Sequence, residues 1–560
     1  MTLAALSGLH QALPSATFTP STTSVGGNVF ATAAVGLLPL VVFFVLMGAF
    51  KVKTHWCAII SFALSALIAI FAFKMPAGMT IMSGTQGLAL GFVPIIYIII
   101  AAVWLYNLTE TSGRSQDLKA VFNTIGKGDQ RAQALIVAFS FCGLMEGLAG
   151  FGAPVAITCA MLVALGLPPV KAAIVTIVGN AINVGFGAIA IPTTTAGKLG
   201  GQDPTLVAQN MGHISWIIAT FIPLILLFIL DGSRGIKQLW PLALVSGFAT
   251  AAGHFFIPEI SYELTAVVAS LLGLAACYVF LLVWTPTTPE EYRTEVAAED
   301  KPNGQRVALA LLPYVLVVVI IAITKLFKSL SKALSATDIK IKWPGVYGDL
   351  LNAKGEPSGS AIYNLQILSN PGTWIFVTAI IVAIVYGLNS SGGRYQTSVG
   401  KMFAVLPKTI YNLRLAILTI SMVMALAYVM NFSGQTTSIG AALATTGAAF
   451  GFLSPMLGYV GTAVAGSATS AGALFANLQA TAAAGAGLDP QILLAANTIG
   501  GGIGKIVSPQ NLAIAATAVN APGTDAEILK KAAPYSIGLL LVLCTLVFIA
   551  SQGWLGSYMP

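Results

Sequence analysis

The sequence predicts an all-α polytopic membrane protein, with about 12 to 14 transmembrane helices at about 20 residues per crossing. It also predicts two inverted repeats, each with a re-entrant hairpin and a glycine-broken helix. Three observations carry this prediction: the composition, the length of the apolar segments and a motif present once in each half. Apolar residues make up 56% of the 560 positions and charged residues 8%, whereas soluble domains carry about 25% charged residues. The composition therefore excludes a soluble globular protein.

Long apolar segments alternate with short polar loops along the chain. They lie at 33–50, 57–73, 86–107, 133–166, 170–197, 213–231, 240–257, 262–284, 306–324, 373–388, 411–431, 441–465, 471–520 and 535–557. We divide the chain into four parts. A polar N-terminal leader (1–32) is expected to be extracellular, and a first repeat half covers 33–284. A cytoplasmic linker (285–305) then leads into the second repeat half, 306–560.

Basic residues in the loops predict the orientation of the chain, because Lys and Arg gather on the cytoplasmic side of a membrane. Lys51 and Lys53 follow the first span, and Lys530 and Lys531 precede the last one. We expect these loops inside the cell and both termini outside. The net charge of +8 then reflects orientation, and no nucleic-acid partner is expected. The leader lacks the basic region of a cleaved signal peptide, so we expect it to be retained.

A motif of the form N-x4-G-x-G-x4-P occurs in each half, at a spacing of 317 residues. It comprises Asn180, Gly185, Gly187 and Pro192 in the first half, and Asn497, Gly502, Gly504 and Pro509 in the second. Glycine costs a helix about 1 kcal/mol relative to alanine, so we predict broken helices at 170–197 and 488–520. Such breaks are tolerated only where they line a cavity or are covered by protein, and a matched pair indicates a midplane binding site. The alternative is that the glycines only permit close helix packing.

A glycine-rich apolar segment precedes each predicted broken helix. Residues 133–166 would be about 51 Å long as one helix, but the apolar core of a bilayer is about 30 Å thick. Gly150 and Gly152 are turn signals within this segment. We therefore predict a re-entrant hairpin at 146–166 and its counterpart at 461–485. Two full crossings in each place remain the alternative, since apolar length cannot separate the two arrangements.

Two ionisable residues lie within these segments. Glu146 is the only acidic residue between 130 and 202, and Lys505 follows the second glycine cluster. An ionisable group at membrane depth costs about 2.5–3.5 kcal/mol and is therefore a candidate functional residue. A structural helix cap for Glu146, and an interfacial position reached by the long side chain of Lys505, are the alternatives.

Three stretches resemble the signature segments of the bacterial L-lactate permease family. They are MEGLAGFGAPVAIT (145–158), GSATSAGALFANLQATAA (466–483) and AANTIGGGIGKIVSPQNLAIA (495–515). The resemblance implies a proton-coupled symporter of L-lactate, D-lactate or glycolate that works by alternating access in the bacterial inner (plasma) membrane. By fold analogy it also suggests kinship with ion transporters built from inverted repeats.

A binding site for such an anion needs positive charge and a few hydrogen-bond partners. Lys505 can supply the charge, and half-helix N-termini can aim free N–H groups at a carboxylate. The other predicted substrate-binding residues are Ser467, Thr469, Ser470, Asn180, Asn497, Gly150, Gly152, Gly502, Gly504 and Ser508. Phe151 or Phe475 is a candidate wall for the substrate methyl group. Glu146 is the predicted proton carrier, since burial in apolar surroundings favours a protonated carboxyl group.

Other functional classes fit the sequence less well. No Ser–His, HExxH or paired-aspartate arrangement lies at membrane depth, so we do not expect an enzyme. The five cysteines are scattered and form no metal-binding pattern, so neither a metal nor a cofactor is expected. A cation–proton antiporter, a channel and a transporter of another small organic anion remain alternatives. Membrane lipid is an expected partner, and the sequence does not predict an oligomeric state.

Overall fold

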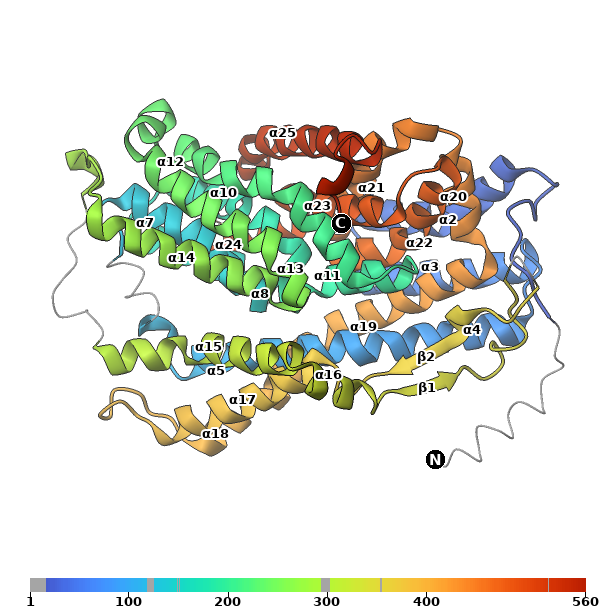
Figure 1. Ribbon diagram of the computed structural model, residues 1–560, viewed down its shortest axis with the longest axis horizontal. Coiled ribbons are helices and arrows are strands. Elements are labelled where there is room, and N and C mark those ends of the chain that lie inside the picture. The colour runs from blue at the N-terminus through green and yellow to red at the C-terminus, as the bar shows by residue number, and fades with distance from the viewer. Residues whose placement is uncertain are drawn as a thin grey trace.

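The structure is a computed structural model that describes residues 17–117, 125–148, 150, 152–293, 303–352, 355–521 and 523–560. Within these residues the chain is mainly helical, with one short two-stranded antiparallel sheet (Figure 1). Residues 1–16 of the predicted leader and 294–302 of the predicted linker lie outside the described residues.

Helices follow one another with short connections in the first half of the chain. Their bounds are α2 (Val29–Gly48), α3 (Thr54–Phe71), α4 (Ala77–Leu90), α5 (Tyr97–Thr111), α7 (Gln130–Ile136), α8 (Cys142–Leu148), α9 (Ala153–Ala164), α10 (Pro169–Asn180), α11 (Gly187–Leu199), α12 (Pro204–Phe256), α13 (Pro258–Ser261) and α14 (Thr265–Val283). Short turns of π- or 3-10 helix join some of them, namely η1 (Gly91–Ile96), η2 (Val137–Phe141), η3 (Ala181–Phe186) and η4 (Tyr262–Leu264).

The second half repeats this pattern and adds the two strands. Its helices are α15 (Gly304–Leu326), α16 (Lys328–Ser335), α17 (Pro371–Leu388), α18 (Val399–Phe403), α19 (Val405–Ser433), α20 (Gln435–Ala444), α21 (Phe450–Ala465), α22 (Ala468–Ala486), α23 (Pro490–Gly504), α24 (Pro509–Ala518) and α25 (Asp525–Ser551), and the strands are β1 (Ile339–Lys342) and β2 (Ile362–Leu365). The 3-10 turn η9 (Lys505–Val507) lies between α23 and α24. Strands β1 and β2 pair with Ile339 opposite Leu365.

Eleven stretches of the described residues are long and apolar enough to cross a membrane. One of them, Pro204–Val283, is 80 residues long and contains both α12 and α14. Helix α12 bends sharply at Asp231 and Gly232, whose backbone angles are not helical, so this stretch holds three long helical segments. The chain is a multi-pass membrane protein.

The helices form two layers, with most axes running roughly along the long dimension of the molecule (Figure 1). The lower layer in this view contains α4, α5, α15, α17 and α19, with β1 and β2 beside them. The upper layer contains the helices of the two repeated segments together with α12, α14 and α25. Within it, Gln130–Leu148 and Pro169–Leu199 are buried throughout their most apolar windows. These two segments of the first half thus lie inside the protein.

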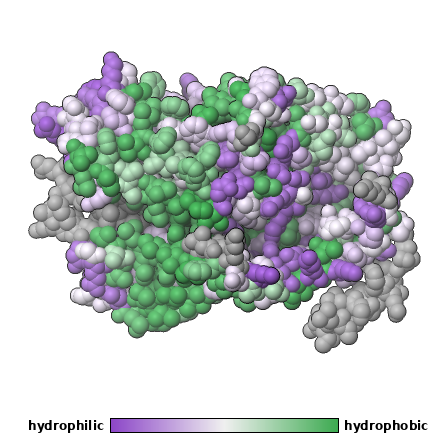
Figure 2. Space-filling model, in the orientation of Figure 1, coloured by the Kyte–Doolittle hydropathy of each residue, from purple (hydrophilic) through white to green (hydrophobic). Residues whose placement is uncertain are grey.

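The outer surface of this bundle is apolar over a continuous region. Figure 2 shows hydrophobic side chains gathered over α12, α14, α15 and α17 in the left half of the view, with hydrophilic side chains at the left end. Phe228, Leu282, Val315 and Leu388 on these helices are each about half exposed or more. A large exposed apolar surface of this kind is typical of contact with a membrane.

Each repeated segment contains a closed helical hairpin. In the first, the chain turns at Gly150 and Gly152, both with positive φ, and Gln130 Nε2 donates a hydrogen bond of 2.5 Å to the carbonyl oxygen of Leu165 across the open end. This first arm begins at Gln130, which makes the hairpin longer than the predicted 146–166. The chain returns to the end from which it came, as it would also do after two full crossings, so the re-entrant arrangement stays a prediction.

The second hairpin is formed by α21 and α22, which turn at Gly466 with a φ of +70°. Its arms are joined by Ser454 and Gln479: Ser454 Oγ donates to Gln479 Oε1 at 2.8 Å, and Gln479 Nε2 donates to the Ser454 carbonyl at 3.0 Å. The first arm begins at Phe450, before the predicted start of the hairpin at 461. The first arm of each hairpin therefore begins earlier than predicted, because the apolar sequence gives no signal at the point where the arm starts.

The helix that follows the first hairpin is broken near its middle. After α10 the chain continues as η3, is extended at Gly187 with a ψ of 155°, and then adopts left-handed angles at Ala188, Ile189 and Ala190. Left-handed backbone is unfavourable for residues with a Cβ atom, so surrounding structure must hold these three residues. The predicted break at 170–197 thus extends from Ala181 to Ala190.

The corresponding helix of the second half breaks later than its glycines suggest. Helix α23 continues through Gly502 and Gly504, and the break follows at Lys505–Ser508. Ser508 is extended with a ψ of 132°, because the proline that follows it disfavours α-helical geometry. A Cβ atom at Gly502 would lie 2.5 Å from the Ala181 carbonyl oxygen. The prediction that glycines unwind this helix was therefore wrong: they permit close helix packing.

The two repeats interlock through their hairpins and broken helices. Helix α9 of the first hairpin packs against α24, the second part of the other broken helix, and α22 of the second hairpin packs against α11. Each hairpin thus rests on the broken helix of the opposite repeat. This exchange brings the two tips and the two breaks together at the centre of the upper layer.

Candidate functional site

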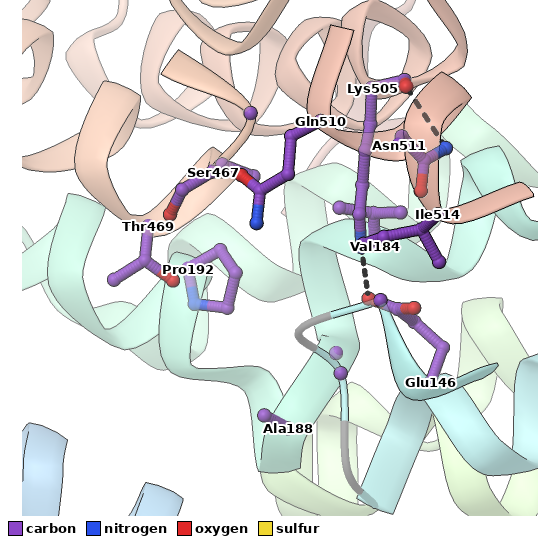
Figure 3. Close-up of a pocket in the computed structure, with 15 residues that line it drawn as sticks. Glu146, Val184, Ala188, Pro192, Ser467, Thr469, Lys505, Gln510, Asn511 and Ile514 are labelled. Atoms are coloured by element: carbon purple, nitrogen blue, oxygen red, sulfur yellow. Dashed lines mark hydrogen bonds and ion pairs between the residues drawn. The ribbon is translucent and has the colours of Figure 1, made fainter. Parts of the chain in front are cut away.

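One cavity lies where the two hairpin tips and the two helix breaks meet (Figure 3). Its volume is about 540 Å³, including the part that opens to solvent. Gly150, Gly152, Gly466 and Ser467 line it from the tips. The first broken helix contributes Ala188 and Pro192, and the break in the second contributes Lys505. Both repeats therefore build a single site.

A buried ion pair crosses this cavity. Lys505 Nζ donates a hydrogen bond of 2.9 Å to Glu146 Oε1, and the two residues are only 7% and 2% exposed. Asn180 Nδ2 donates to the other carboxylate oxygen, Glu146 Oε2, at 2.8 Å. Figure 3 shows Lys505 extending from the second half towards Glu146 of the first half. The two ionisable residues singled out in the sequence thus neutralise one another.

Backbone geometry makes room for this pair. A Cβ atom at Gly187 would lie 2.8 Å from Glu146 Oε1, so only glycine lets the carboxylate occupy its position. Gly150 has a φ of +57°, an angle that glycine adopts readily. Lys505 follows the end of α23, and its side chain enters the space that the break opens. The break therefore places a full charge in the cavity, although the glycines before it do not cause the break.

Helix N-termini surround the cavity on several sides. Ser467 caps α22 by accepting a hydrogen bond of 3.2 Å from the backbone N–H of Ser470, and Thr469 lies in the first turn of the same helix. Gln510 and Asn511 lie in the first turn of α24, and all of these residues except Ser470 line the cavity. Helix N-termini carry partial positive charge and favour anions. Together with Lys505 they make the cavity suitable for an anion.

The structure brings six of the predicted site residues to this cavity. They are Glu146, Gly150, Gly152, Ser467, Thr469 and Lys505. Asn180 acts one step away, through its hydrogen bond to Glu146. Ser470 lines an adjoining cavity instead, and Ser470 Oγ donates a hydrogen bond to Ser467 Oγ at 3.2 Å.

Four other predicted residues have structural positions. Asn497 Oδ1 accepts a hydrogen bond of 3.3 Å from Gln479 Nε2. The Asn497 side chain therefore contacts the second hairpin. Ser508 Oγ donates to the Lys505 carbonyl at 3.1 Å and accepts from the backbone N–H of Asn511, so it shapes the break. Gly502 and Gly504 pack against neighbouring backbone. None of the four lines the cavity among the described residues.

Sequence reasoning did not find the contribution of the first turn of α24. Asn511 Nδ2 donates to the Lys505 carbonyl oxygen at 3.1 Å, while its buried Oδ1 has no hydrogen-bond partner among the described residues. The sequence Pro509-Gln510-Asn511, which places two polar side chains directly after a proline at a helix start, was the available signal. Val184 and Ile514 form the apolar wall of the cavity. Phe475 stacks on Phe44 instead, and Phe151 lies outside the described residues.

The chain can be assigned to a family by comparison with known proteins. Residues 32–552 match the family model described as L-lactate permease. The chain belongs to the L-lactate permease family. The resemblance carried by the three signature segments is thereby confirmed, and membership in a family of permeases makes this chain a transporter.

Curated members of the L-lactate permease family align with nearly the whole chain. The L-lactate permease of Bacillus subtilis is 34% identical over 95% of this chain and 98% of its own length. The glycolate permease GlcA of Escherichia coli is 35% identical over 93% of this chain and 97% of its own. Among solved structures, MtrF of Neisseria gonorrhoeae has a TM-score of 0.43 and 15% identity, covering 84% of this chain and 83% of that one.

Proposed function

We propose that this permease imports L-lactate, and also D-lactate or glycolate, together with a proton by alternating access. The observation that carries the proposal is the Lys505–Glu146 pair, buried in a cavity that both repeats line. The relatives named L-lactate permease and glycolate permease support this substrate class. All of these substrates carry one carboxylate and one neighbouring hydroxyl group.

The ion pair suggests how anion and proton are coupled. In the empty site the Glu146 carboxylate neutralises Lys505. A substrate carboxylate that approaches Lys505 competes with Glu146 for the same ammonium group. Two carboxylates and one ammonium group would leave an uncompensated charge in a buried site, which is strongly unfavourable. Uptake of one proton by Glu146 removes that charge.

This scheme keeps the site neutral in both of its states. The empty site holds one cation and one anion, and the loaded site holds Lys505, the substrate carboxylate and a protonated Glu146. A neutral site costs least to carry across a membrane, since charges at membrane depth are expensive. The scheme therefore predicts one proton for each substrate anion.

The rest of the cavity suits a small hydroxy acid. Hydroxyl groups of Ser467 and Thr469 and the unpaired Oδ1 of Asn511 can bond the substrate oxygens. Val184 and Ile514 offer an apolar surface for a methyl group. Lys505 is the one cation among the residues that line this cavity in the described chain, which favours monocarboxylates over dicarboxylates.

We place the protein in the inner membrane of a bacterium, with both termini outside, on the strength of its loop charges and its family. Movement of the upper layer of helices against the lower layer would expose the cavity to the two sides in turn, while membrane lipid surrounds both layers. This transport cycle requires neither a cofactor nor a nucleic acid.

Transport by the purified protein in liposomes tests the proposal. An inward proton gradient should drive uptake of labelled L-lactate; unlabelled D-lactate and glycolate should compete, whereas dicarboxylates should not. Uptake that ignores the proton gradient, at saturating and at sub-saturating lactate, contradicts proton symport. Liposomes without protein, and protein-containing liposomes without a proton gradient, provide the controls.

A further inference from the structure

A second cavity adjoins the substrate cavity and shares two lining residues with it, Ser467 and Gln510. Its volume is about 900 Å³, including the part that opens to solvent. It lies between the start of α3, the middle of α19 and the tip of the second hairpin, because residues from each of these elements line it. The second cavity thus borders both helix layers and the substrate site.

The walls of this second cavity suit an anion. Lys53 and His55 line it beside the start of α3, and Thr419 and Ser470 contribute hydroxyl groups from α19 and α22. No acidic residue lines it in the described part of the chain. Lys53 is exposed, and its ammonium group forms no ion pair with a described residue. Its charge is therefore available to a ligand.

We propose that this cavity is a vestibule on the cytoplasmic side, which binds a small carboxylate anion as it passes between the substrate cavity and the cell interior, with Lys53 as the cation that attracts it. The proposal rests on the proposed function of the substrate site and extends it to the access path. Ser470, predicted from the sequence to bind substrate, would act here and not at the ion pair.

A third cavity that adjoins the second one supports this path. Lys51 and Asp525 line that outer cavity, which again includes Gln510. Gln510 thus borders all three cavities, and Figure 3 shows it next to Ser467 at the edge of the substrate site. From the loop between α2 and α3 inwards, the cations along the path are Lys51, Lys53 and Lys505. Positive charge along an access path raises the local concentration and the association rate of an anion.

Transport kinetics at two salt concentrations test the role of Lys53. In Lys53→Gln the KM for L-lactate supplied on the side of the loop between α2 and α3 should rise about 10-fold at low ionic strength, with kcat unchanged, since electrostatic attraction acts mainly on association. At high ionic strength the difference should shrink, because salt screens exposed charges. Lys408→Gln is the matched control: this exposed lysine lies on α19 and lines none of the three cavities. An unchanged KM at low salt in Lys53→Gln overturns the proposal.

Chemical labelling provides a readout that does not depend on transport. The five native cysteines are all buried, so a Thr419→Cys variant offers one accessible thiol in the vestibule. A negatively charged methanethiosulfonate should label it faster than a positively charged one, and adding Lys53→Gln should remove this preference. Equal labelling rates with Lys53 present overturn the vestibule. Preferential labelling in a protein that fails to take up lactate overturns the proposed function instead.

Discussion

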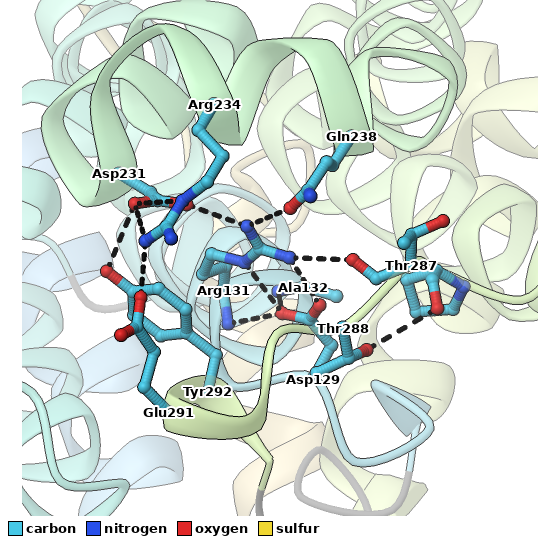
Figure 4. Close-up of polar contacts among 11 residues, drawn as sticks. Asp129, Arg131, Ala132, Asp231, Arg234, Gln238, Thr287, Thr288, Glu291 and Tyr292 are labelled. Atoms are coloured by element: carbon cyan, nitrogen blue, oxygen red, sulfur yellow. Dashed lines mark hydrogen bonds and ion pairs between the residues drawn. The ribbon is translucent and has the colours of Figure 1, made fainter.

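Two buried cations in this protein have very different surroundings. Arg131, 1% exposed, donates all five of its guanidinium N–H groups (Figure 4). Its Nε and one Nη2 hydrogen bond go to Asp129, and the other Nη2 bond goes to the Thr287 carbonyl. Nη1 donates at 2.7 Å both to Asp231 Oδ2 and to Gln238 Oε1. This cluster joins α7, the bend in α12 and the segment after α14.

Lys505 is the opposite case. Its ammonium group donates one hydrogen bond within the described part of the chain, to Glu146, and it faces a cavity. An ammonium group has three donors, so two are left for a ligand. The comparison distinguishes two kinds of buried cation. Arg131 belongs to a saturated cluster, in which every N–H donor of the cation is used and the bonds hold helices together. Lys505 belongs to an unsaturated pair, in which the cation keeps free donors and can exchange its partner. Burial alone does not distinguish the two.

Removal of the saturated cation should have the largest effect on stability. Arg131→Gln leaves Asp129 and Asp231 in the cluster without their buried cation, and breaking a buried pair in this way costs about 3–5 kcal/mol. We expect a marked fall in the thermal unfolding temperature in detergent. The fraction that remains folded should bind L-lactate with normal affinity by calorimetry. A stable Arg131→Gln protein that has lost lactate binding would contradict the structural role.

Removal of the unsaturated cation should act on binding. Lys505→Ala deletes the one positive charge among the described residues that line this cavity, and loss of a desolvated partner costs about 2–5 kcal/mol. Lactate affinity should therefore fall by between one and a half and nearly four decades, on the scale of about 1.4 kcal/mol per decade. Lys505→Arg should restore it only in part, because the planar guanidinium needs more room. Wild-type affinity in Lys505→Ala, measured by calorimetry, would show that the lysine is not part of the site.

Glu146→Gln should separate binding from coupling. Glutamine imitates the protonated carboxyl group, so the variant should bind L-lactate and exchange it across a liposome membrane. It should fail at net uphill uptake, because the empty carrier can no longer release a proton and restore the ion pair. Exchange and net uptake measured in parallel give the answer. Normal gradient-driven accumulation would exclude Glu146 as the proton carrier and direct attention to His213, His254 or Glu263.

The smallest effects are expected at the neutral partners of the two clusters. Gln238→Ala removes one acceptor from Arg131 and should lower the free energy of unfolding by about 1.5–3 kcal/mol, the usual worth of a hydrogen bond to a charged group, without changing transport. Asn180→Ala removes a donor from Glu146 and should slow net uptake more than exchange, because the carboxylate form is less well stabilised. Equal effects of both variants on net uptake would contradict the assignment of a structural role to the Arg131 cluster and a transport role to the Lys505–Glu146 pair.

Much of this protein follows from its sequence alone. Composition and the length of the apolar segments predict a membrane protein, because long apolar helices with few charged residues are stable in lipid and would be exposed to water in a soluble protein. The repeat comes from glycine and proline spacing, since these residues act on the backbone locally. Glu146 and Lys505 stand out because ionisable groups are costly at membrane depth. Each of these properties is local, so it can be read without knowing which helices are neighbours.

Only the tertiary structure decided which residues meet. Glu146 and Lys505 lie 359 residues apart, and the hairpin tips reach one cavity because each hairpin packs on the broken helix of the other repeat. The same packing assigns Gly502 to a helix contact, where the close approach of two backbones outweighs the weak helix preference of glycine. It also turns Asn497 towards Gln479 and away from the substrate cavity. Such choices depend on contacts between distant segments, and a pattern along the chain does not contain them.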